Sequence, residues 1–246
     1  MVFRIRFCLC IGVFLAAVSA AFPLTSNELK AKVGQVTHGF KDITLTCKVG
    51  YANHTELKKI GKDFPKTYEF KSTTVWYKSP DKMKVEGKLG LVRVAIIMND
   101  DKKAIHIPSI HYSKTEDISD DPHKRQTDFD IGIVTESLWQ DYSVVDVDTE
   151  KNSDPIYKIT FVRNNARSKK HIAWVDANTL KLLKVEKYEG NGKLKSRFLY
   201  SGHTSVNGVW VPTRIDVYSP DGKLAGTTTY EGIKVNTNLA DSIFKI

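Results

Sequence analysis

The segment IYKITFVR, Ile156–Arg163, alternates apolar and polar side chains along its whole length. Tyr157, Ile159 and Phe161 share one face of an extended chain, and the lysine and threonine between them share the other. This period of two predicts a β-strand with one face on an apolar interior and one face in water. The pattern recurs as far as Val235, so this region decides the predicted fold.

Five such segments follow one another, separated by residues that favour turns. The segments are Ile156–Arg163, His171–Val175 with Leu180–Lys187, Leu194–Ser201, Val209–Ser219 and Leu224–Val235. The turns are Asp176-Ala177-Asn178-Thr179, Glu189-Gly190-Asn191-Gly192, Asn207-Gly208 and Pro220-Asp221-Gly222, which tolerate positive φ or preset a turn. The pattern predicts consecutive antiparallel hairpins, a meander without crossover helices.

The chain before this meander predicts more strands and two helices. Thr25–Phe40 combines a capping box, Thr25 with Glu28, and an apolar stripe, and Ile131–Tyr142 carries a second stripe. The predicted strands are Asp42–Tyr51, Thr67–Lys78, Lys82–Glu86, Leu91–Met98 and Lys103–Ile107, and Ser109–Asp130 is predicted to be an exposed loop. The fold class is therefore mainly β (α+β), with a large curved antiparallel sheet covered by a few short helices.

The first twenty residues have the features of a signal peptide. Arg4 and Arg6 are followed by the apolar run Phe7–Val18 and the small-residue cleavage site Val18-Ser19-Ala20. The apolar run is short for a membrane-spanning helix. We therefore expect residues 1–20 to be removed and residues 21–246 to form one exported, soluble domain.

The net charge limits the classes of binding partner, and the cysteine count limits the role of the thiol. The chain has 37 Lys and Arg against 28 Asp and Glu, and removal of Arg4 and Arg6 leaves 35 against 28. A basic surface favours anionic partners such as a membrane face, while export argues against nucleic acid. The alternative is that the lysines only keep the outer face of the sheet soluble. Cys47 is alone after Cys8 and Cys10 leave, which predicts a buried thiol rather than a catalytic one.

No catalytic motif stands out, so the sequence predicts no enzyme and no cofactor. A phosphate-binding loop and a nucleophile elbow are both absent from the sequence. A weak group of metal-ligating types lies at His106, His111, Asp120, Asp121 and His123, without a recognised ligand spacing. A hydrolase would need this region to assemble a site, and we predict no metal there.

The predicted sheet has an apolar inner face, which two short helices must cover. One interpretation is an ordinary core between sheet and helices. The other is that the helices leave a cavity for a small hydrophobic molecule, because clefts that are mostly apolar bind such ligands. The candidate cavity residues are Tyr68, Phe70, Trp76, Val94, Ile96, Leu138, Trp139, Tyr157, Ile159, Phe161, Ile172 and Trp174.

Several motifs in order resemble the outer-membrane lipoprotein-sorting family of periplasmic carriers. They are the strand, proline turn and strand at Thr74–Glu86, the hairpin Ile97–Pro108, Trp174-Val175-Asp176, Pro212-Thr213-Arg214-Ile215 and the closing Leu239–Phe244. The resemblance implies a half-open β-barrel with a helical lid and a hydrophobic cavity for lipoprotein acyl chains. It also implies a monomeric periplasmic carrier or chaperone that sorts lipoproteins, or a similar lipidic ligand, to the outer membrane.

Two points qualify what the resemblance implies. The carriers have an arginine before the turn proline that helps to hold the lid closed, and this chain has Ser79 there, with Arg93 as a candidate substitute. The lid is predicted at Ile131–Tyr142, with Leu138 and Trp139 facing the sheet. The alternative function is an envelope sensor of the same fold that recognises a lipidated ligand or a membrane-protein partner.

Overall fold

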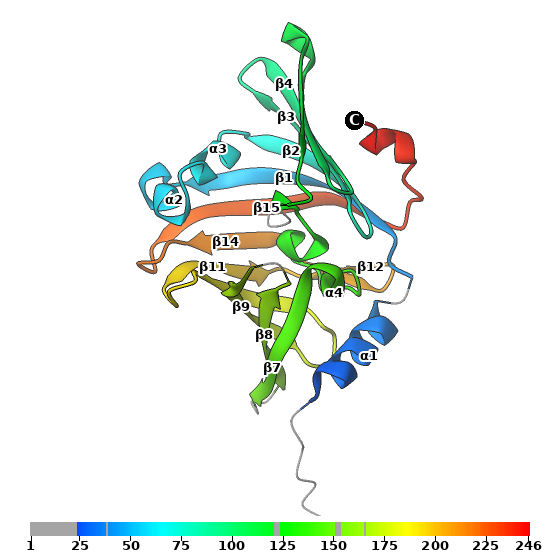
Figure 1. Ribbon diagram of the computed structural model, residues 1–246, viewed down its shortest axis with the longest axis vertical. Helices are drawn as coiled ribbons and strands as arrows, with labels where there is room; N and C mark the ends of the chain where they lie inside the picture. Colours follow the sequence, from blue (N-terminus) through cyan, green and yellow to red (C-terminus); the bar gives the residue numbers. More distant parts are fainter. Residues whose placement is uncertain (1–23, 38, 121–123, 151–153, 165) are drawn as a thin grey trace, which may run out of the picture.

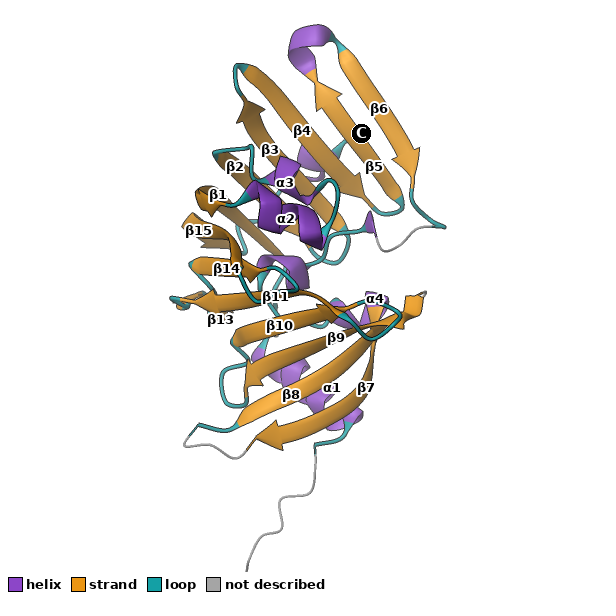
Figure 2. Ribbon diagram, turned by 90° about the vertical axis from the view of Figure 1, so that its left-hand side faces the viewer, coloured by secondary structure: helices purple, strands orange, loops and turns teal. Residues whose placement is uncertain are grey.

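Thirteen antiparallel strands form one curved sheet that does not close (Figures 1 and 2). The computed structural model describes residues 24–246 except 38, 121–123, 151–153 and 165. The strand order is β6-β5-β4-β3-β2-β1-β15-β14-β11-β10-β9-β8-β7, so β6 and β7 are the two free edges. Figure 2 shows the sheet as a single curved surface between these edges. The predicted fold class, a half-open antiparallel sheet with few helices, is confirmed.

The meander predicted from the sequence forms one half of this sheet. Its strands are β8 (Ile156–Arg163), β9 (Ala166–Asp176), β10 (Leu182–Tyr188), β11 (Leu194–Ser201), β14 (Arg214–Tyr218) and β15 (Leu224–Val235), and β7 (Tyr142–Glu150), which the sequence did not predict, is added at the edge. A small separate hairpin, β12 (Thr204–Val206) with β13 (Val209–Val211), lies between β11 and β14. No crossover helix interrupts the described part of this region, and the predicted succession of antiparallel hairpins is confirmed. The single strand predicted at Val209–Ser219 was wrong, because the chain leaves β13 at Val211 and enters the large sheet only at Arg214.

The other half is built by the first six strands, which also run in chain order. They are β1 (Asp42–Ala52), β2 (Ser72–Lys78), β3 (Lys82–Leu89), β4 (Val92–Asn99), β5 (Lys102–Ile107) and β6 (Tyr112–Asp117). Pairing of β1 with β15 joins the two halves, so strands from opposite ends of the chain meet in the middle of the sheet. The concave cavity described below forms beside this junction.

Short helices cover the concave face. They are α1 (Ser26–Val36), α2 (His54–Ile60), α3 (Phe64–Thr67) and α4 (Leu138–Asp141), with the 3-10 turn η3 (Asp128–Ile131). Two further 3-10 turns lie elsewhere: η1 (Pro108–Ile110) connects β5 to β6, and η4 (Asp241–Phe244) lies on the outer face. The predicted capping box is present, because Thr25 Oγ1 accepts from the Glu28 amide while the Glu28 carboxylate accepts from the Thr25 amide. Leu29 and Val33 of α1 are fully buried in the core. No helix of the described residues is long and apolar enough to cross a membrane.

The predicted helix Ile131–Tyr142 was wrong. Gly132 adopts a φ of 90°, a left-handed conformation that ends η3 and that a helix interior does not allow. Only Leu138–Asp141 is α-helical, and Tyr142 already begins β7. Ile131, Val134 and Leu138 have helical spacing in the sequence, but they belong to a mostly irregular segment that buries all three side chains.

Other boundaries also moved. Strand β2 begins at Ser72 instead of Thr67, because the chain first forms α3. The expected loop Ser109–Asp130 contains the exposed edge strand β6, the turn η1 and most of η3. Strand β4 is apolar on both faces because η4 packs against the outer side of β3 and β4, burying Phe244.

Candidate functional site

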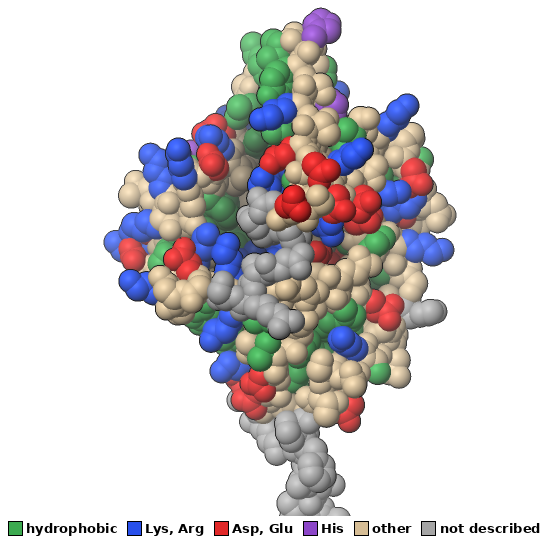
Figure 3. Space-filling view, in the orientation of Figure 1, with side chains coloured by type: hydrophobic (Ala, Val, Ile, Leu, Met, Phe, Trp, Pro, Cys, Tyr) green, Lys and Arg blue, Asp and Glu red, His purple; other side chains and the backbone are tan. Residues whose placement is uncertain are grey.

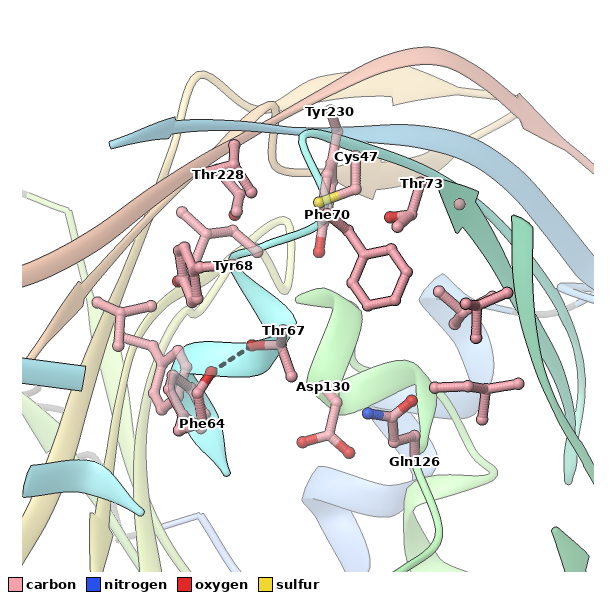
Figure 4. A pocket seen from close by; sticks show the side chains of 18 of the residues that line it. Cys47, Phe64, Thr67, Tyr68, Phe70, Thr73, Gln126, Asp130, Thr228 and Tyr230 are labelled. Carbon is pink, nitrogen blue, oxygen red and sulfur yellow. Dashed lines mark hydrogen bonds between the residues drawn. The ribbon is translucent and has the colours of Figure 1, made fainter. Parts of the chain in front are cut away.

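A cavity of about 310 Å³ lies on the concave side of the sheet, between its middle strands and the segments α3 and η3 (Figure 4). Its walls are mostly apolar, and they come from β1, β2, β3, β4, β11, β14 and β15. The volume falls at the lower end of the range of about 300–1,000 Å³ for small-molecule sites. The shape and lining are therefore those of a pocket for one small apolar ligand.

Helices α2 and α3 form the rim of the cavity at the end of β15. Asn53 caps α2 through bonds from the amides of Thr55 and Glu56, and the buried Glu56 carboxylate accepts from Ser219 at 2.6 Å. The following turn α3 places the Phe64 ring 6.0 Å from the Tyr68 ring. Both rings line the cavity.

Gly226 on β15 makes room for Tyr68. A Cβ atom at this position would overlap the Tyr68 ring, so only glycine allows the ring to lie flat on the strand. The ring is largely buried, and burial raises the pKa of Tyr68 above its ordinary value. Tyr68 is therefore a fixed wall of the cavity and keeps its proton at neutral pH.

One wall of the cavity is a set of small and branched side chains on β2, β3 and β4. Val85 and Ile96 are partners in the register of β3 and β4, and Val94 is the partner of Gly87. Phe70 leans over Gly87, because a Cβ there would lie 3.0 Å from the Phe70 ring. This wall carries no charged side chain.

The opposite wall comes from β1, β11, β14 and β15. Phe198, Ile215, Val217 and Tyr230 line it together with Cys47, the free cysteine of the described residues. Figure 4 shows the Cys47 sulfur pointing to the interior next to Tyr230. Desolvation raises the pKa of the Cys47 thiol, which favours the neutral form, although the side chain is half-buried and not fully buried as predicted.

The cavity has one charged end. Asp130 Oδ1 accepts a hydrogen bond from Lys187 Nζ at 3.0 Å, and Gln126 lies beside them, across the cavity from Cys47 (Figure 4). Burial alone would raise the pKa of Asp130, but the Lys187 ammonium group outweighs it and holds the pKa below its ordinary value. The pair joins η3 to β10 and closes this end of the cavity.

Behind η3 a buried hydrogen-bond network fixes the segment that was predicted to be the lid. The fully buried Asp128 accepts from the Phe129 amide at 3.1 Å and from the Thr135 hydroxyl. Thr135 is bonded to Ser137 at 2.9 Å, and Ser137 to the Tyr77 hydroxyl at 3.3 Å. Desolvation raises the pKa of Asp128 to about 6.

This network supplies anchoring where the sequence lacks the arginine of the carriers. Tyr77 donates to the Pro80 carbonyl at 2.8 Å, directly beside Ser79. Arg93 is not a substitute, because it lies on the outer face, 3.4 Å from Glu86. Lys187–Asp130 and the chain from Tyr77 to Asp128 therefore tie η3 and the segment after it to the sheet, and Asn164 Nδ2 donates to the Gln140 carbonyl of α4 at 2.9 Å.

The twelve predicted cavity residues fall into three groups. Four of them line the cavity, namely Tyr68, Phe70, Val94 and Ile96. Five belong to the packed core between the sheet and its covering segments α1, η3 and α4, namely Leu138, Trp139, Tyr157, Ile159 and Phe161. Three lie on the outer face, namely Trp76, Ile172 and Trp174. Ligand binding by the first group remains a prediction.

Neighbouring side chains fill the space around the five core residues. Phe161 packs within 6.1 Å of the Trp139 ring and 5.7 Å of the Phe129 ring. Lys32 of α1 donates to the Tyr157 hydroxyl at 3.1 Å. Leu138 and Ile159 have no exposed surface. These contacts leave no room for a ligand at these positions.

The outer-face group was assigned to the wrong face. Trp76 alternates with the buried Val75 and Tyr77, and its ring lies under Lys84 on the neighbouring strand. Trp174 lies under Lys184, with its indole donating to Glu150 at 3.1 Å. The sequence analysis assumed that large aromatic side chains point to the interior. Here the side chains of Lys84 and Lys184 cover the two tryptophan rings on the solvent-exposed face.

The sequence analysis missed most of the far wall and the charged end. Phe198, Ile215 and Val217 lie on the apolar face of alternating segments, and this alternation was the available signal. Asp130 and Lys187 lie on distant segments, and no spacing relates them. For the His106 group, the described residues contain no cluster of three groups able to hold a metal. Asp121 and His123 lie outside the described residues.

Comparison with known proteins places this fold. A family model described as "-like: Uncharacterized protein" matches residues 71–246, so the chain belongs to that family. A comparison with curated proteins finds no match. Among solved structures, a LolA superfamily protein from Nitrosomonas europaea is 16% identical, with a TM-score of 0.61, over 90% of this chain and 98% of that one.

Two further structures agree. A DUF1329 family protein from Desulfovibrio piger is 13% identical, and an outer membrane lipoprotein-sorting protein domain from Vibrio parahaemolyticus is 12% identical. Each has a TM-score of 0.53 and covers 89% of this chain and 95% of its own. At these identities the likeness establishes a shared fold, and at that level the predicted resemblance is confirmed.

Proposed function

We propose that this protein is an exported carrier that binds an acyl chain of a lipoprotein or a similar lipid in its concave cavity. The observation that carries the proposal is the apolar cavity of about 310 Å³ bounded by fixed aromatic side chains. The named structural neighbours, a LolA superfamily protein and a lipoprotein-sorting domain, support the same class of ligand. The role is binding and transfer, without chemistry on the ligand.

Burial of the chain would supply the affinity. Each methylene removed from water contributes about 0.8 kcal/mol, before the cost of ordering the ligand. The cavity wall is rigid, since Tyr68 and Phe70 are held against glycines on β15 and β3. A preformed wall reduces the ordering cost on the protein side.

The size of the cavity restricts the cargo. A volume near the minimum for ligand sites suits one acyl chain rather than several. A lipid with more chains would need η3 to move away from β10, which breaks the contact between Asp130 and Lys187. We therefore infer that single-chain amphiphiles bind without rearrangement.

The signal-peptide features of residues 1–20 support export, and the proposed site of action is the periplasm. Residues 21–246 would act there as one monomeric domain that passes lipid towards the outer membrane. An envelope sensor that holds a lipidated ligand would use the same cavity, and would differ in releasing it only to a membrane-protein partner.

The test is binding of a fluorescent fatty acid to the wild-type chain and to Ile96→Trp. Ile96 lines the cavity, so the larger side chain fills it, and we expect binding to fall at least about tenfold. The matched control is Ile172→Trp on the outer face, which should bind like the wild type. Equal binding by Ile96→Trp and the wild type, with both folded by circular dichroism, would refute the proposed site.

A further inference from the structure

The concave cavity is apolar on the side of β4. Val94 and Ile96 line it there, and the register partner of Ile96 on β5 is Ile105, another apolar residue. Val92 and its partner Leu89 continue the same face beyond Val94, and both are exposed. Figure 3 shows hydrophobic side chains gathered at the top of the molecule, over the ends of β3 and β4. This side of the cavity therefore suits the tail of a lipid.

The cavity is polar on the side of η3 and β10, which the strand order places far from β4. Among the described residues that line the cavity, Asp130 and Lys187 are the charged ones, one of each sign. The Asp130 carboxylate is fixed, because Oδ2 accepts from the Thr127 amide at 3.1 Å while Oδ1 accepts from Lys187 at 3.0 Å. The pair therefore presents an oriented dipole without net charge to the cavity.

Hydrogen-bonding capacity remains on this polar side. An ammonium group has three donors, and within the described part of the chain Lys187 uses one of them, on Asp130. The Gln126 side chain lies beside Asp130 (Figure 4), and its amide forms no hydrogen bond with another described residue. Lys187 and Gln126 can therefore both donate to a ligand in the cavity.

A polar row on the concave face of the sheet continues behind Lys187. Its register partners on β9 and β11 are His171 and Ser196. His171 Nδ1 and Ser196 Oγ are buried, and neither has a hydrogen-bond partner among the described residues. Burial lowers the pKa of His171 to about 3, so the ring adds polarity without charge. An apolar tail placed here would leave polar groups unpaired, so this side suits the head of the ligand.

The pairing of Asp130 with Lys187 decides which head is favoured. A charged head loses its hydration in the cavity and gains little in return, because the two side chains offset each other. A carboxylate is attracted by Lys187 and repelled by Asp130, and an ammonium group meets the reverse. An uncharged carbonyl loses less hydration and can still accept from Lys187 or Gln126.

We propose that Asp130 and Lys187 select lipids whose acyl chain ends in an uncharged hydrogen-bonding head, an ester or an amide. The head accepts from Lys187 and Gln126, and the tail points towards β4 and β5. A free fatty acid enters the same cavity with lower affinity. This rests on the proposed function, since it assigns the head group of the ligand whose chain the cavity holds.

The test compares 1-monodecanoylglycerol, decanoate and decylammonium as competitors of a neutral dye, Nile red, bound to the full chain at neutral pH. The test variants each remove one charge of the pair. Asp130→Asn leaves Lys187 unopposed, and Lys187→Gln leaves Asp130 unopposed.

A second ion pair supplies the matched controls. Lys48 and Glu231 are exposed and lie 2.6 Å apart. They point to the outer face, because their chain neighbours Cys47 and Tyr230 line the cavity. Lys48→Gln and Glu231→Gln each remove the same charge as one test variant.

We expect the wild type to bind 1-monodecanoylglycerol about tenfold more tightly than either ionic ligand. Asp130→Asn should tighten the binding of decanoate about tenfold and weaken that of decylammonium, and Lys187→Gln should do the opposite. Both control variants should keep the wild-type order. Each comparison is a ratio measured on one protein, so a change in stability does not mimic it.

The outcomes separate failure of this inference from failure of the proposed function. An ionic ligand that binds the wild type as tightly as the ester would overturn the head-group selection. So would the wild-type order in both test variants, because the head would then lie elsewhere; if one variant does not fold, the other decides. In these cases the cavity remains a site for the chain. If none of the ligands displaces the dye from the wild type, the proposed function itself fails.

Discussion

The two halves of the sheet have the same alternating strands but different occupants on their concave side. Over β7, β8 and β9 the concave face is filled by α1, η3 and α4, and Phe161 and Ile159 have no exposed surface. Over β2, β3 and β4 the equivalent positions, such as Val85 and Ile96, stay half-buried and line a cavity. The edge of the meander half is therefore a packed core, whereas β2, β3 and β4 supply one wall of a cavity.

The difference arises from how the helices are attached. Helix α1 lies on the meander half, where Lys32 reaches Tyr157. The short helices α2 and α3 cover only the rim near β15, so the middle of the other half has no helix over it. An apolar strand face is therefore necessary for a cavity but does not identify one.

Leu138→Asp should have the largest effect, because it places a charge in the filled half. Leu138 is fully buried in the core, so we expect a loss of more than about 4 kcal/mol and an unfolded or molten chain. Thermal melts and near-ultraviolet circular dichroism measure it. The sequence had placed this residue on a lid, from which it predicts only a modest loss, and a small change in melting temperature would restore that interpretation.

The buried network under η3 predicts a pH dependence of stability. The pKa of Asp128 is raised to about 6 by desolvation, so its protonated form is favoured in the folded state. The free energy of unfolding contributed by Asp128 therefore falls as pH rises from about 4 to about 6, by up to about 3 kcal/mol.

Asp128→Asn should remove this contribution while keeping a side chain of the same shape. Denaturant unfolding of both chains at several pH values measures the difference between the two profiles. Other carboxylates, such as Asp130, whose pKa is lowered, act alike in both proteins and cancel. Parallel profiles for wild type and variant would show that Asp128 is ionised throughout.

Loss of the ion pair between η3 and β10 should have the smallest effect. Lys187 and Asp130 are each 26% exposed, so solvent screens their attraction. Lys187→Gln should lower stability by about 1 kcal/mol and speed the dissociation of a bound fatty acid, measured by stopped-flow fluorescence. An unchanged dissociation rate would mean that η3 does not gate the cavity.

The sequence predicted the fold well because its evidence was local. Period-two alternation and turn residues placed β8, β11 and β15 with the same boundaries as in the structure. The helical interpretation of Ile131–Tyr142 failed because side chains buried from an irregular segment mimic helical spacing, and only the conformation of Gly132 reveals the break.

The site was predicted only in part, because it depends on tertiary arrangement. Strand alternation assigns faces correctly for Ile159 and Phe161 but cannot tell whether a helix will cover them. It also failed for Trp76 and Trp174, where lysines shield aromatic rings on the water side. The contact between Asp130 and Lys187 joins segments that are distant in the sequence, and no local pattern in either segment predicts it.

Cys47 gives the most direct test that the cavity holds a chain. Its sulfur points into the cavity, so a bound chain must block its alkylation, and Cys8→Ser with Cys10→Ser makes it the single thiol of the full chain. We predict that decanoate slows modification by iodoacetamide at least about tenfold, saturating at one ligand per protein. An unchanged alkylation rate at ligand concentrations that displace a bound fluorescent fatty acid would contradict the account, because the chain would then lie elsewhere.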